Sequence, residues 1–368
     1  MSGAATVDSL VASTYVVPTE VPEADGTLSW DSTTLVLVEV TGAGLSGIGW
    51  TYSGRGCQAV VEDVLEPAVT GRAVDDIPAS WTAMVQATRN LGRPGMVSAA
   101  IAAVDIALWD LKAKAYDAAL CALLGQARDA VPVYGSGGFT TYDEAMLRRQ
   151  LEQWVGELGI SWVKVKIGEA AGTRVDRDLE RVAQVRAVVG PHVEVFVDAN
   201  GGYSRKQAVR VGRCLDALDV RWFEEPVSSD DLAGLREVRH ALDSDVTAGE
   251  YGCDLPYFRR MLQAGAVDCL QADVSRTAGV SEWLRVATLA AAQGVELSAH
   301  CAPSLHLHPA AAAPNLRHVE WFADHVHLEG LLFDPAPRVQ GGVMRPDLGR
   351  PGLGVELRRA DAAAFRVG

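Results

Sequence analysis

Three carboxylates recur at regular intervals in this 368-residue chain and are the first residues that could do chemistry. Asp198, Glu224 and Glu250 each follow a short apolar run, and 26 residues separate each from the next. Taken singly, each fits a turn or a strand end. Placed together on three neighbouring strands, they would repel one another strongly unless a cation lay between them. Hard oxygen ligands of this kind suit Mg²⁺, and Mn²⁺ would also fit.

Two lysines precede the carboxylates in the chain. Lys164 and Lys166 alternate with apolar residues, so a strand places both ammonium groups on one face. In a barrel that face is the interior, where two neighbouring lysines would lower each other's pKa and favour a neutral amine that acts as a base. Taken alone, the pair also fits a half-exposed strand with solvated lysines.

Further ionisable residues follow at the ends of later apolar runs, namely Asp273, His300 and Glu320. A buried carboxylate beside an imidazole fixes the tautomer and raises the pKa of the imidazole, giving an acid or base poised near neutral pH. Burial that keeps Glu320 protonated would let it donate a hydrogen bond to a developing oxyanion. We interpret the remaining ionisable residues nearby as supporting or structural: Glu225, His306, His308, His325 and His327.

The elements that must hold these residues follow a regular rhythm from Val131 onward. β-like segments alternate with amphipathic helical patterns, among them 176–189 and 232–242. The rhythm predicts an α/β fold with a closed parallel (β/α)8 barrel of the TIM type, in which catalytic groups project from the C-terminal ends of the strands. A doubly wound open sheet is the alternative, although no G-x-G-x-x-G sequence follows an early strand. The expected strands lie within 131–138, 162–168, 193–200, 220–226, 245–250, 267–274, 295–301 and 318–322.

The first 130 residues lack this rhythm. β-like runs at 33–40 and 47–52 are separated by glycine-rich turns, and the apolar spacing at 98–115 predicts a helix. We therefore predict an α+β capping domain over residues 1–130 and a catalytic barrel with an irregular last helix over 131–345. A C-terminal segment, 346–368, is expected to return to the cap and complete it.

Composition argues against several classes of protein. The chain carries 33 Lys and Arg against 47 Asp and Glu, a formal net charge of −14, whereas proteins that bind nucleic acid or anionic membranes usually carry a basic surface. No apolar run approaches the roughly 20 residues needed to cross a bilayer. Six cysteines without metal-like spacing, and an N-terminus without signal-peptide features, predict a cytoplasmic protein with reduced thiols.

In their order along the chain, these residues resemble the enolase superfamily, and specifically its mandelate racemase subgroup, which includes muconate lactonizing enzyme-like proteins. The likeness covers nearly the whole chain, from the helical pattern before the barrel to the PGLGVEL sequence near the C-terminus. One small departure is Ala278-Gly279, where relatives often carry two glycines. The motifs that carry the resemblance are Lys164-x-Lys166, Asp198-x-Asn200, Glu224-Glu225-Pro226, Gly249-Glu250, Asp273, His300 and Glu320.

The resemblance implies a small-molecule carboxylate substrate that loses its α-proton to give an enediolate, with Mg²⁺ held by Asp198, Glu224 and Glu250. Lys166 and His300 would approach opposite faces of the α-carbon, while Lys164 and Glu320 stabilise the developing charge. Many members with this residue set dehydrate acid sugars, so we expect a sugar acid or diacid to be converted to a 2-keto-3-deoxy acid. Racemisation or epimerisation of a 2-hydroxy acid is the second expectation, and cycloisomerisation of a sugar-acid lactone the third. We also expect a homo-oligomer, between a dimer and an octamer.

Substrate choice in this family depends largely on two capping-domain loops, expected here at 18–31 and 50–54. Trp30 and Tyr52 in these loops, with Asn200 and Arg276 on the barrel, are the candidate substrate-binding residues, although both aromatic rings could equally serve packing. Two other classes of protein stay open. One is a Schiff-base barrel, either a class I aldolase or a pyridoxal phosphate racemase, which leaves the three carboxylates unexplained. The other is a barrel that binds a sugar acid without catalysis.

Overall fold

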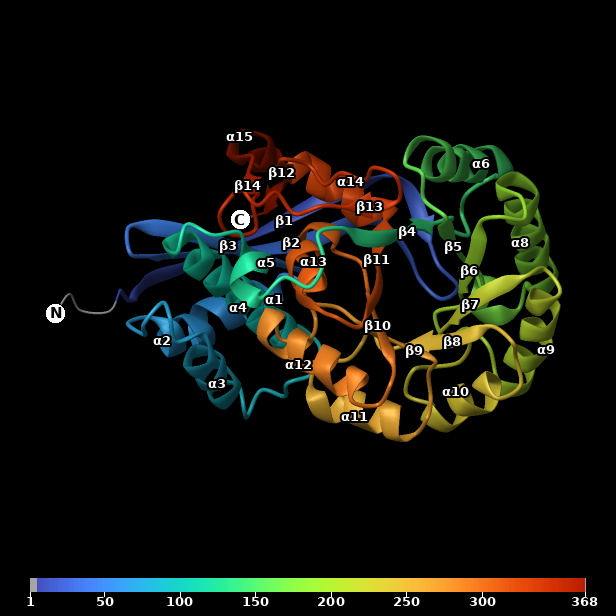
Figure 1. The fold of residues 1–368 in the computed structure, drawn as a ribbon, viewed down its shortest axis with the longest axis horizontal. Helices are drawn as coiled ribbons and strands as arrows, with labels where there is room; N and C mark the ends of the chain where they lie inside the picture. Colours follow the sequence, from blue (N-terminus) through green and yellow to red (C-terminus); the bar gives the residue numbers. More distant parts are fainter. Residues whose placement is uncertain (1–4, 368) are drawn as a thin grey trace.

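A closed barrel with a smaller sheet-and-helix domain beside it forms the protein in a computed structural model that describes residues 5–367 (Figure 1). All eight barrel strands are parallel, and the ring closes where the last strand pairs with the first, Val319 opposite Val133. The structure confirms the predicted TIM-type α/β barrel. Its strands are β4 (Val131–Gly137), β5 (Trp162–Lys166), β6 (Glu194–Asp198), β7 (Val220–Glu224), β8 (Asp245–Ala248), β9 (Cys269–Ala272), β10 (Glu296–Ala299) and β11 (Leu316–Phe322).

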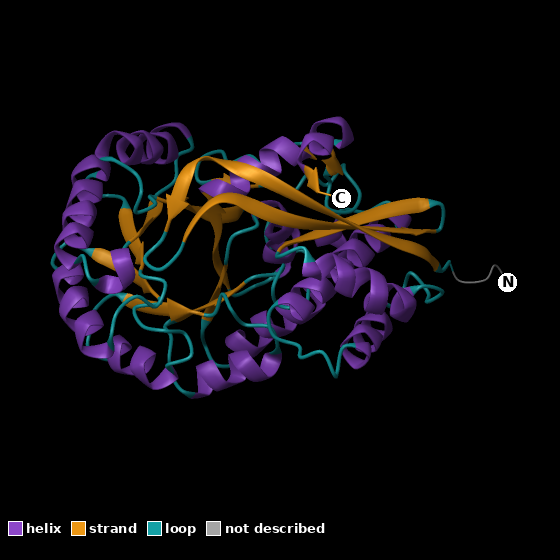
Figure 2. Ribbon diagram, turned by 180° about the vertical axis from the view of Figure 1, so that it is seen from behind, coloured by secondary structure: helices purple, strands orange, loops and turns teal. Residues whose placement is uncertain are grey.

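Helices follow the strands and form the outer ring of the barrel (Figure 2). The helix predicted at 232–242 ends three residues earlier, at Arg239. The helix after the last strand, which we expected to be irregular, runs for ten residues and contacts both the barrel and the cap. These elements are α6 (Glu144–Glu152), η2 (Gln153–Glu157), α7 (Glu169–Gly172), α8 (Val175–Val189), α9 (Arg205–Asp216), α10 (Leu232–Arg239), α11 (Leu255–Gln263), α12 (Val280–Ala291), α13 (Pro303–Ala312) and α14 (Ala323–Leu332).

The strand residues alternate between the helix-facing side and the barrel interior. On β5, Val163 and Val165 join the main hydrophobic core, whereas Lys164 and Lys166 point inward. One layer below the catalytic end, the rings of Phe196 and Trp222 stack with their centroids 5.2 Å apart. These buried rings form an apolar layer beneath the charged residues.

The cap is a four-stranded antiparallel sheet with helices packed on it. Its longest helix, α4, lies so close to β3 that a Cβ atom on Gly49 would meet the carbonyl oxygen of Ala103 at 2.3 Å. Glycine is therefore needed there for this close packing. The cap elements are β1 (Val7–Ala24), β2 (Ser29–Gly42), β3 (Leu45–Tyr52), α1 (Gly56–Val60), η1 (Val61–Leu65), α2 (Glu66–Val69), α3 (Ile77–Ala87), α4 (Met96–Ala115) and α5 (Leu120–Leu124).

Residues 18–31 form a β-hairpin, so the prediction of a loop there is wrong. The pairing of β1 with β2 has an irregularity between Pro18 and Glu23, resumes at Glu23 opposite Trp30 and reaches Ala24 opposite Ser29, so only a short turn joins the two strands. Figure 2 shows this hairpin extending from the cap sheet across the barrel. Its tip is tied to the barrel loops, because the amide of Ala171 donates to the carbonyl of Gly26 at 2.9 Å. Pro18 and the acidic residues after it have low strand propensity, which hid this strand in the sequence.

The C-terminal segment returns to the cap, as predicted. The amide of Leu353 donates to Asp110 on α4 at 2.7 Å, and the last strand pairs with β1 at the edge of the cap sheet. All six cysteines are free thiols. Within residues 5–367, no helix is both long enough and apolar enough to cross a membrane. The elements of this segment are β12 (Phe333–Asp334), β13 (Val343–Met344), β14 (Glu356–Leu357), α15 (Arg359–Ala362), η3 (Ala363–Phe365) and β15 (Arg366–Val367).

Candidate active site

The three regularly spaced carboxylates meet at the C-terminal mouth of the barrel. Asp198 and Glu224 are the last residues of β6 and β7, and Glu250 lies two residues beyond β8. All three are buried, and one oxygen from each lies within 4.8 Å of the others. Gly249, with a φ of 137° and no room for a Cβ atom against the carbonyl of Gln271, makes the turn before Glu250. We call Asp198, Glu224 and Glu250 the carboxylate triad.

The residues around the triad fit a hard divalent cation. The buried oxygens Glu250 Oε2, Glu225 Oε1 and Asn200 Oδ1 have no hydrogen-bond donor, and such orphaned acceptors are destabilising. Burial raises the pKa of Glu224 to about 7; Lys164 opposes this rise and Asp198 adds to it. A cluster of buried carboxylate oxygens in which some acceptors lack a donor suits Mg²⁺, which binds such ligands together with water and substrate oxygens.

Lys164 and Lys166 point into this cluster, but their pKa values move opposite to the prediction. The Nζ of Lys164 lies 2.7 Å from both Glu224 and Glu320, and that of Lys166 lies 2.5 Å from Asp198. Burial lowers the pKa of each lysine, and Lys164 lowers that of Lys166, yet the nearby carboxylates outweigh these effects and raise both. Neighbouring acids on other strands, which the lysine spacing does not reveal, therefore keep both amines charged.

Asp273 and His300 are brought together at the ends of β9 and β10. The Nδ1 of His300 lies 2.9 Å from Asp273, whose other oxygen accepts hydrogen bonds from the amide and hydroxyl of Ser275. Burial lowers the pKa of His300, but Cys301 and Glu250 raise it well above its usual value. With Nδ1 held by Asp273, Nε2 is directed to Glu250 at 3.3 Å, on the side of the carboxylate triad.

Glu320 is an ionised acceptor here, so its surroundings do not favour the protonated state in which it would donate a hydrogen bond. One oxygen accepts from the hydroxyl of Ser136 at 2.6 Å and lies beside Lys164, and the other accepts from the amide of Cys301 at 2.8 Å. Burial raises the pKa of Glu320, but the charges of Lys164 and then His300 outweigh this effect. The pKa of Glu320 therefore lies well below its usual value.

A cavity of about 400 Å³ lies between these residues and the cap. All four candidate substrate-binding residues line this cavity, but the polar atoms of three of them already contact other protein groups. The indole of Trp30 donates to Glu23 at 3.0 Å, and the hydroxyl of Tyr52 donates to Glu329 at 2.8 Å, so both offer ring surface to the cavity. Arg276 lies 3.2 Å from Glu250, whereas the side-chain oxygen of Asn200 has no donor.

Several lining residues were not among the predicted site residues. Cys301 directly follows His300, with its Sγ atom 3.3 Å from His300 Nε2. Asp324 and His325 follow the last barrel strand, and His325 stacks on Tyr52 at 3.4 Å between ring centroids. Their position just after strand ends is the signal that could have found them. The remaining lining residues not predicted are Asp25, Leu28, Ser32, Thr33, Thr34, Ser53, Gly54, Tyr251 and Phe322.

A buried acid behind the cavity wall predicts a pH-dependent stability. Burial, followed by repulsion from Asp324, raises the pKa of Glu23 from 4.5 to about 8. Because the pKa of Glu23 is higher in the folded state than in the unfolded state, its contribution to the free energy of unfolding is fully present below pH 4.5. This contribution is lost as the pH rises through 8. We expect Glu23→Gln to increase the free energy of unfolding at pH 9 by on the order of 2 kcal/mol, and therefore to raise Tm at that pH. At pH 5 the variant should change Tm little. Thermal unfolding at both pH values measures this.

The matched control for this prediction is Glu20→Gln. Glu20 lies on the same strand, but its side chain is 78% exposed. Because Glu20 makes only a minor contribution to the raised pKa of Glu23, this variant should change the difference between the two pH values far less than Glu23→Gln does. An equal change in Tm at pH 5 and pH 9 for Glu23→Gln would contradict the assignment of the titration to Glu23.

Comparison with protein families gives two matches that together span most of the chain. Residues 11–125 match the N-terminal domain of mandelate racemase / muconate lactonizing enzyme. Residues 146–362 match the enolase C-terminal domain-like family. The first match falls in the cap, and the second covers β5 to β11 and continues into the C-terminal segment.

Individual relatives include two sugar-acid dehydratases. The L-talarate/galactarate dehydratase of Salmonella typhimurium is 34% identical over 288 residues, which cover 76% of this chain and 71% of the relative. The arabinonate dehydratase of Saccharolobus solfataricus is 31% identical over 338 residues, 88% of each chain.

Solved structures share the whole fold. A mandelate racemase/muconate lactonizing enzyme-like protein from Rubrobacter xylanophilus has a TM-score of 0.95 and 43% identity, covering 98% of this chain and 100% of its own. The Salmonella dehydratase, solved with Mg and L-lyxarohydroxamate, has a TM-score of 0.91 and 28% identity, covering 100% of this chain and 94% of its own.

Proposed function

The chain belongs to the mandelate racemase and muconate lactonizing enzyme family of the enolase superfamily and is an enzyme of that superfamily, and from this premise we propose that it dehydrates a sugar acid. The product is a 2-keto-3-deoxy acid, formed after the α-proton next to the substrate carboxylate is removed. The observation that carries the proposal is the placement of Lys166 and His300. They extend from β5 and β10, and both line the cavity beside the carboxylate triad.

Asp198, Glu224 and Glu250 would hold Mg²⁺. When bound, the ion supplies a Lewis acid that makes the α-proton of a carboxylate substrate more acidic. The donor-free oxygen of Glu250 supports this assignment, as does the magnesium in the structure of the Salmonella relative. Lys164, 2.7 Å from Glu224, supplies a fixed positive charge that strengthens its hold on the substrate carboxylate as negative charge develops there.

Lys166 and His300 divide the proton transfers. Lys166 first releases its ammonium proton to solvent, and a cation held by Asp198 would favour this release by weakening the contact that raises the lysine pKa. The neutral amine then removes the α-proton of the substrate. His300 has a raised pKa and enters the reaction as an imidazolium, so it donates a proton from Nε2 to the β-hydroxyl as the C–O bond breaks. Asp273 holds the other ring nitrogen and keeps Nε2 directed at the cavity. The same two groups would support racemisation of a substrate that lacks a β-hydroxyl.

The charges on the cavity wall favour a monocarboxylic sugar acid. Within the part of the chain that the structure describes, Lys166 and Arg276 are the lysine and arginine residues that line the cavity, and Arg276 already lies beside Glu250 and Asp273. Toward the cap, the wall offers the hydroxyls of the threonines and serine at 32–34 and the carboxyl of Asp324. A second substrate carboxylate would be repelled there, whereas sugar hydroxyls would find hydrogen-bond partners.

Replacing Asp324 should shift this preference. Asp324 is buried, accepts a hydrogen bond from Thr33 at 2.6 Å, and has a pKa raised by burial. We expect Asp324→Asn to improve kcat/KM for galactarate relative to arabinonate by roughly 10-fold, about 1.4 kcal/mol. Asp31→Asn, at an exposed position on β2, is the matched control and should leave the ratio unchanged. A ratio that is the same in Asp324→Asn and the wild type would argue against Asp324 as the group that disfavours diacids.

A screen of mono- and diacid sugars for 2-keto acid formation tests the proposed reaction. We expect at least one monocarboxylic sugar acid to give a 2-keto acid, and we expect a chelator to stop the reaction. Trapping of the substrate on a lysine by borohydride would instead support a Schiff-base barrel. Absence of both product and α-proton exchange across the screen would contradict catalysis on sugar acids.

A further inference from the structure

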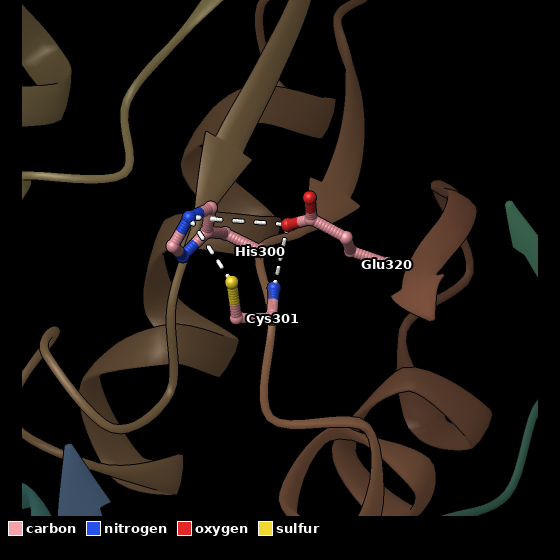
Figure 3. Close-up of side chains that lie close together, drawn as sticks. All are labelled: His300, Cys301 and Glu320. Atoms are coloured by element: carbon pink, nitrogen blue, oxygen red, sulfur yellow. Dashed lines mark hydrogen bonds and ion pairs between the residues drawn. The ribbon is translucent and has the colours of Figure 1, made fainter. Parts of the chain in front are cut away.

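A second group of metal-binding atoms, softer than the carboxylate triad, lies beside His300 (Figure 3). His300 Nε2 is 3.3 Å from the Sγ of Cys301 and 3.8 Å from an oxygen of Glu320. All three donors are buried, and their ligand atoms lie within 4.8 Å of one another. An imidazole, a thiol and a carboxylate thus converge on one point.

The spacing of these atoms fits a tetrahedral zinc ion. Zn–N bonds of about 2.05 Å and Zn–S bonds of about 2.3 Å separate neighbouring ligand atoms by roughly 3.4 to 3.6 Å. The distances from His300 Nε2, 3.3 Å and 3.8 Å, bracket this range without any movement of the side chains. Magnesium prefers an all-oxygen set, whereas thiolate and imidazole select zinc and similar metals.

Two further observations point to a ligand at this place. Glu250 Oε2 is buried without a hydrogen-bond donor and lies 3.3 Å from His300 Nε2, so an acceptor that lacks a donor faces this nitrogen. Asp273 holds His300 through Nδ1 at 2.9 Å. A carboxylate on the far nitrogen of a histidine is the arrangement that orients zinc-binding imidazoles in proteins.

The backbone after β10 places the sulfur there. Cys301 and Ala302 have φ values of 52° and 42°, in the left-handed region that non-glycine residues seldom adopt. This turn brings the thiol of Cys301 back against the ring of the preceding His300, and the amide of Cys301 donates to Glu320. Strained backbone of this kind is typical of positions where a side chain must be held in place.

We propose that His300, Cys301 and Glu320 form a zinc site, with water as the fourth ligand, and that zinc bound there inhibits the enzyme. On binding, the S–H bond of Cys301 and the Nε2–H bond of the His300 imidazolium break, both protons pass to solvent, and the sulfur and the nitrogen keep the electron pairs that bind the metal. No electron is transferred. The ion occupies Nε2 of His300, the nitrogen that would otherwise donate the proton. The inhibition rests on the proposed function, whereas the binding site does not.

Cobalt(II) is the probe for the sulfur ligand, because a thiolate bound to Co²⁺ absorbs in the near ultraviolet. The full chain, saturated with Mg²⁺, is titrated with Co²⁺ in the wild type, in Cys301→Ser and in Cys214→Ser. Cys214 is the exposed thiol among the six, so its removal controls for binding at the surface. We expect one equivalent of Co²⁺ to give the band in the wild type and in Cys214→Ser, and Cys301→Ser to lack it. Zinc should displace the cobalt and remove the band.

Inhibition is measured separately. We expect zinc to inhibit turnover in Mg²⁺-saturated wild type and Cys214→Ser, and to require at least roughly 10-fold more zinc in Cys301→Ser. A cobalt band that persists in Cys301→Ser, is absent from the wild type, or disappears in Cys214→Ser would overturn the site. Equal zinc inhibition with and without Cys301 would overturn its inhibitory role.

If Cys301→Ser fails to fold, the site can still be tested by anomalous diffraction from wild-type crystals soaked in zinc. An anomalous peak between His300 Nε2 and Cys301 Sγ supports the proposal, and zinc found only at the carboxylate triad contradicts it. If no sugar acid is turned over, the proposed function fails, but the cobalt band and the zinc peak still decide whether the site exists.

Discussion

Lys166→Ala should lower kcat by about 10²- to 10⁴-fold, the usual contribution of a positioned general base, while Mg²⁺ binding persists. The variant removes the amine that faces the cavity, but the carboxylate triad stays in place. It also removes a cation that lies 2.5 Å from Asp198 and competes with a metal for that oxygen. The affinity for Mg²⁺ should therefore stay the same or increase. Product formation and calorimetric titration with Mg²⁺ measure the two effects.

Lys166→Arg distinguishes a base from a structural cation. Arginine keeps the positive charge beside Asp198, but its guanidinium does not lose a proton at accessible pH. We expect this variant to be as inactive as Lys166→Ala. Recovery of turnover by arginine would show that Lys166 acts only through its charge, and near wild-type rates in Lys166→Ala would refute the two-group scheme.

His300→Asn should lower kcat for dehydration by a comparable factor of about 10²- to 10⁴-fold, but it should act at a different step. Lys166 is intact in this variant and still exchanges the α-proton, whereas the acid that protonates the departing hydroxyl is missing. The amide of asparagine retains a donor for Asp273, which limits disruption of the fold. We therefore expect α-proton exchange with D₂O to continue while 2-keto acid formation stops.

NMR measures α-proton exchange and the product assay measures 2-keto acid formation, so together they show which step is lost in His300→Asn. Loss of both exchange and product, with Mg²⁺ binding retained, would assign His300 to removal of the α-proton instead. Wild-type dehydration in the variant would exclude His300 from the reaction altogether.

Alternation along strands and the spacing of βα units predicted much of this molecule. Val163, Lys164, Val165 and Lys166 alternate as expected, and the interval between Asp198, Glu224 and Glu250 placed them on adjacent strands of one closed ring. Such patterns are visible in sequence because they depend on strand period and unit length.

The charge states of buried groups and the directions of their side chains could not be predicted from strand period and unit length. Lys164 and Glu320 meet across strands far apart in sequence, and this contact favours the ionised form of Glu320 despite its burial. The sulfur of Cys301 approaches His300 only because the backbone turns at a φ of 52°. The hairpin over the barrel was missed because Pro18 and its acidic neighbours resemble a loop. The segment forms a strand because it pairs with β2.

Proton exchange in D₂O tests the central claim, that Lys166 removes the α-proton of a carboxylate held at the carboxylate triad. The measurement is ¹H NMR of a sugar acid from the screen, incubated with the wild type, Lys166→Ala and the Lys166→Ala/His300→Asn double variant, with and without Mg²⁺. The account predicts loss of the α-proton signal in the wild type with Mg²⁺, and its retention without the metal and in both variants. Exchange that continues in the double variant, or that needs no Mg²⁺, would contradict it.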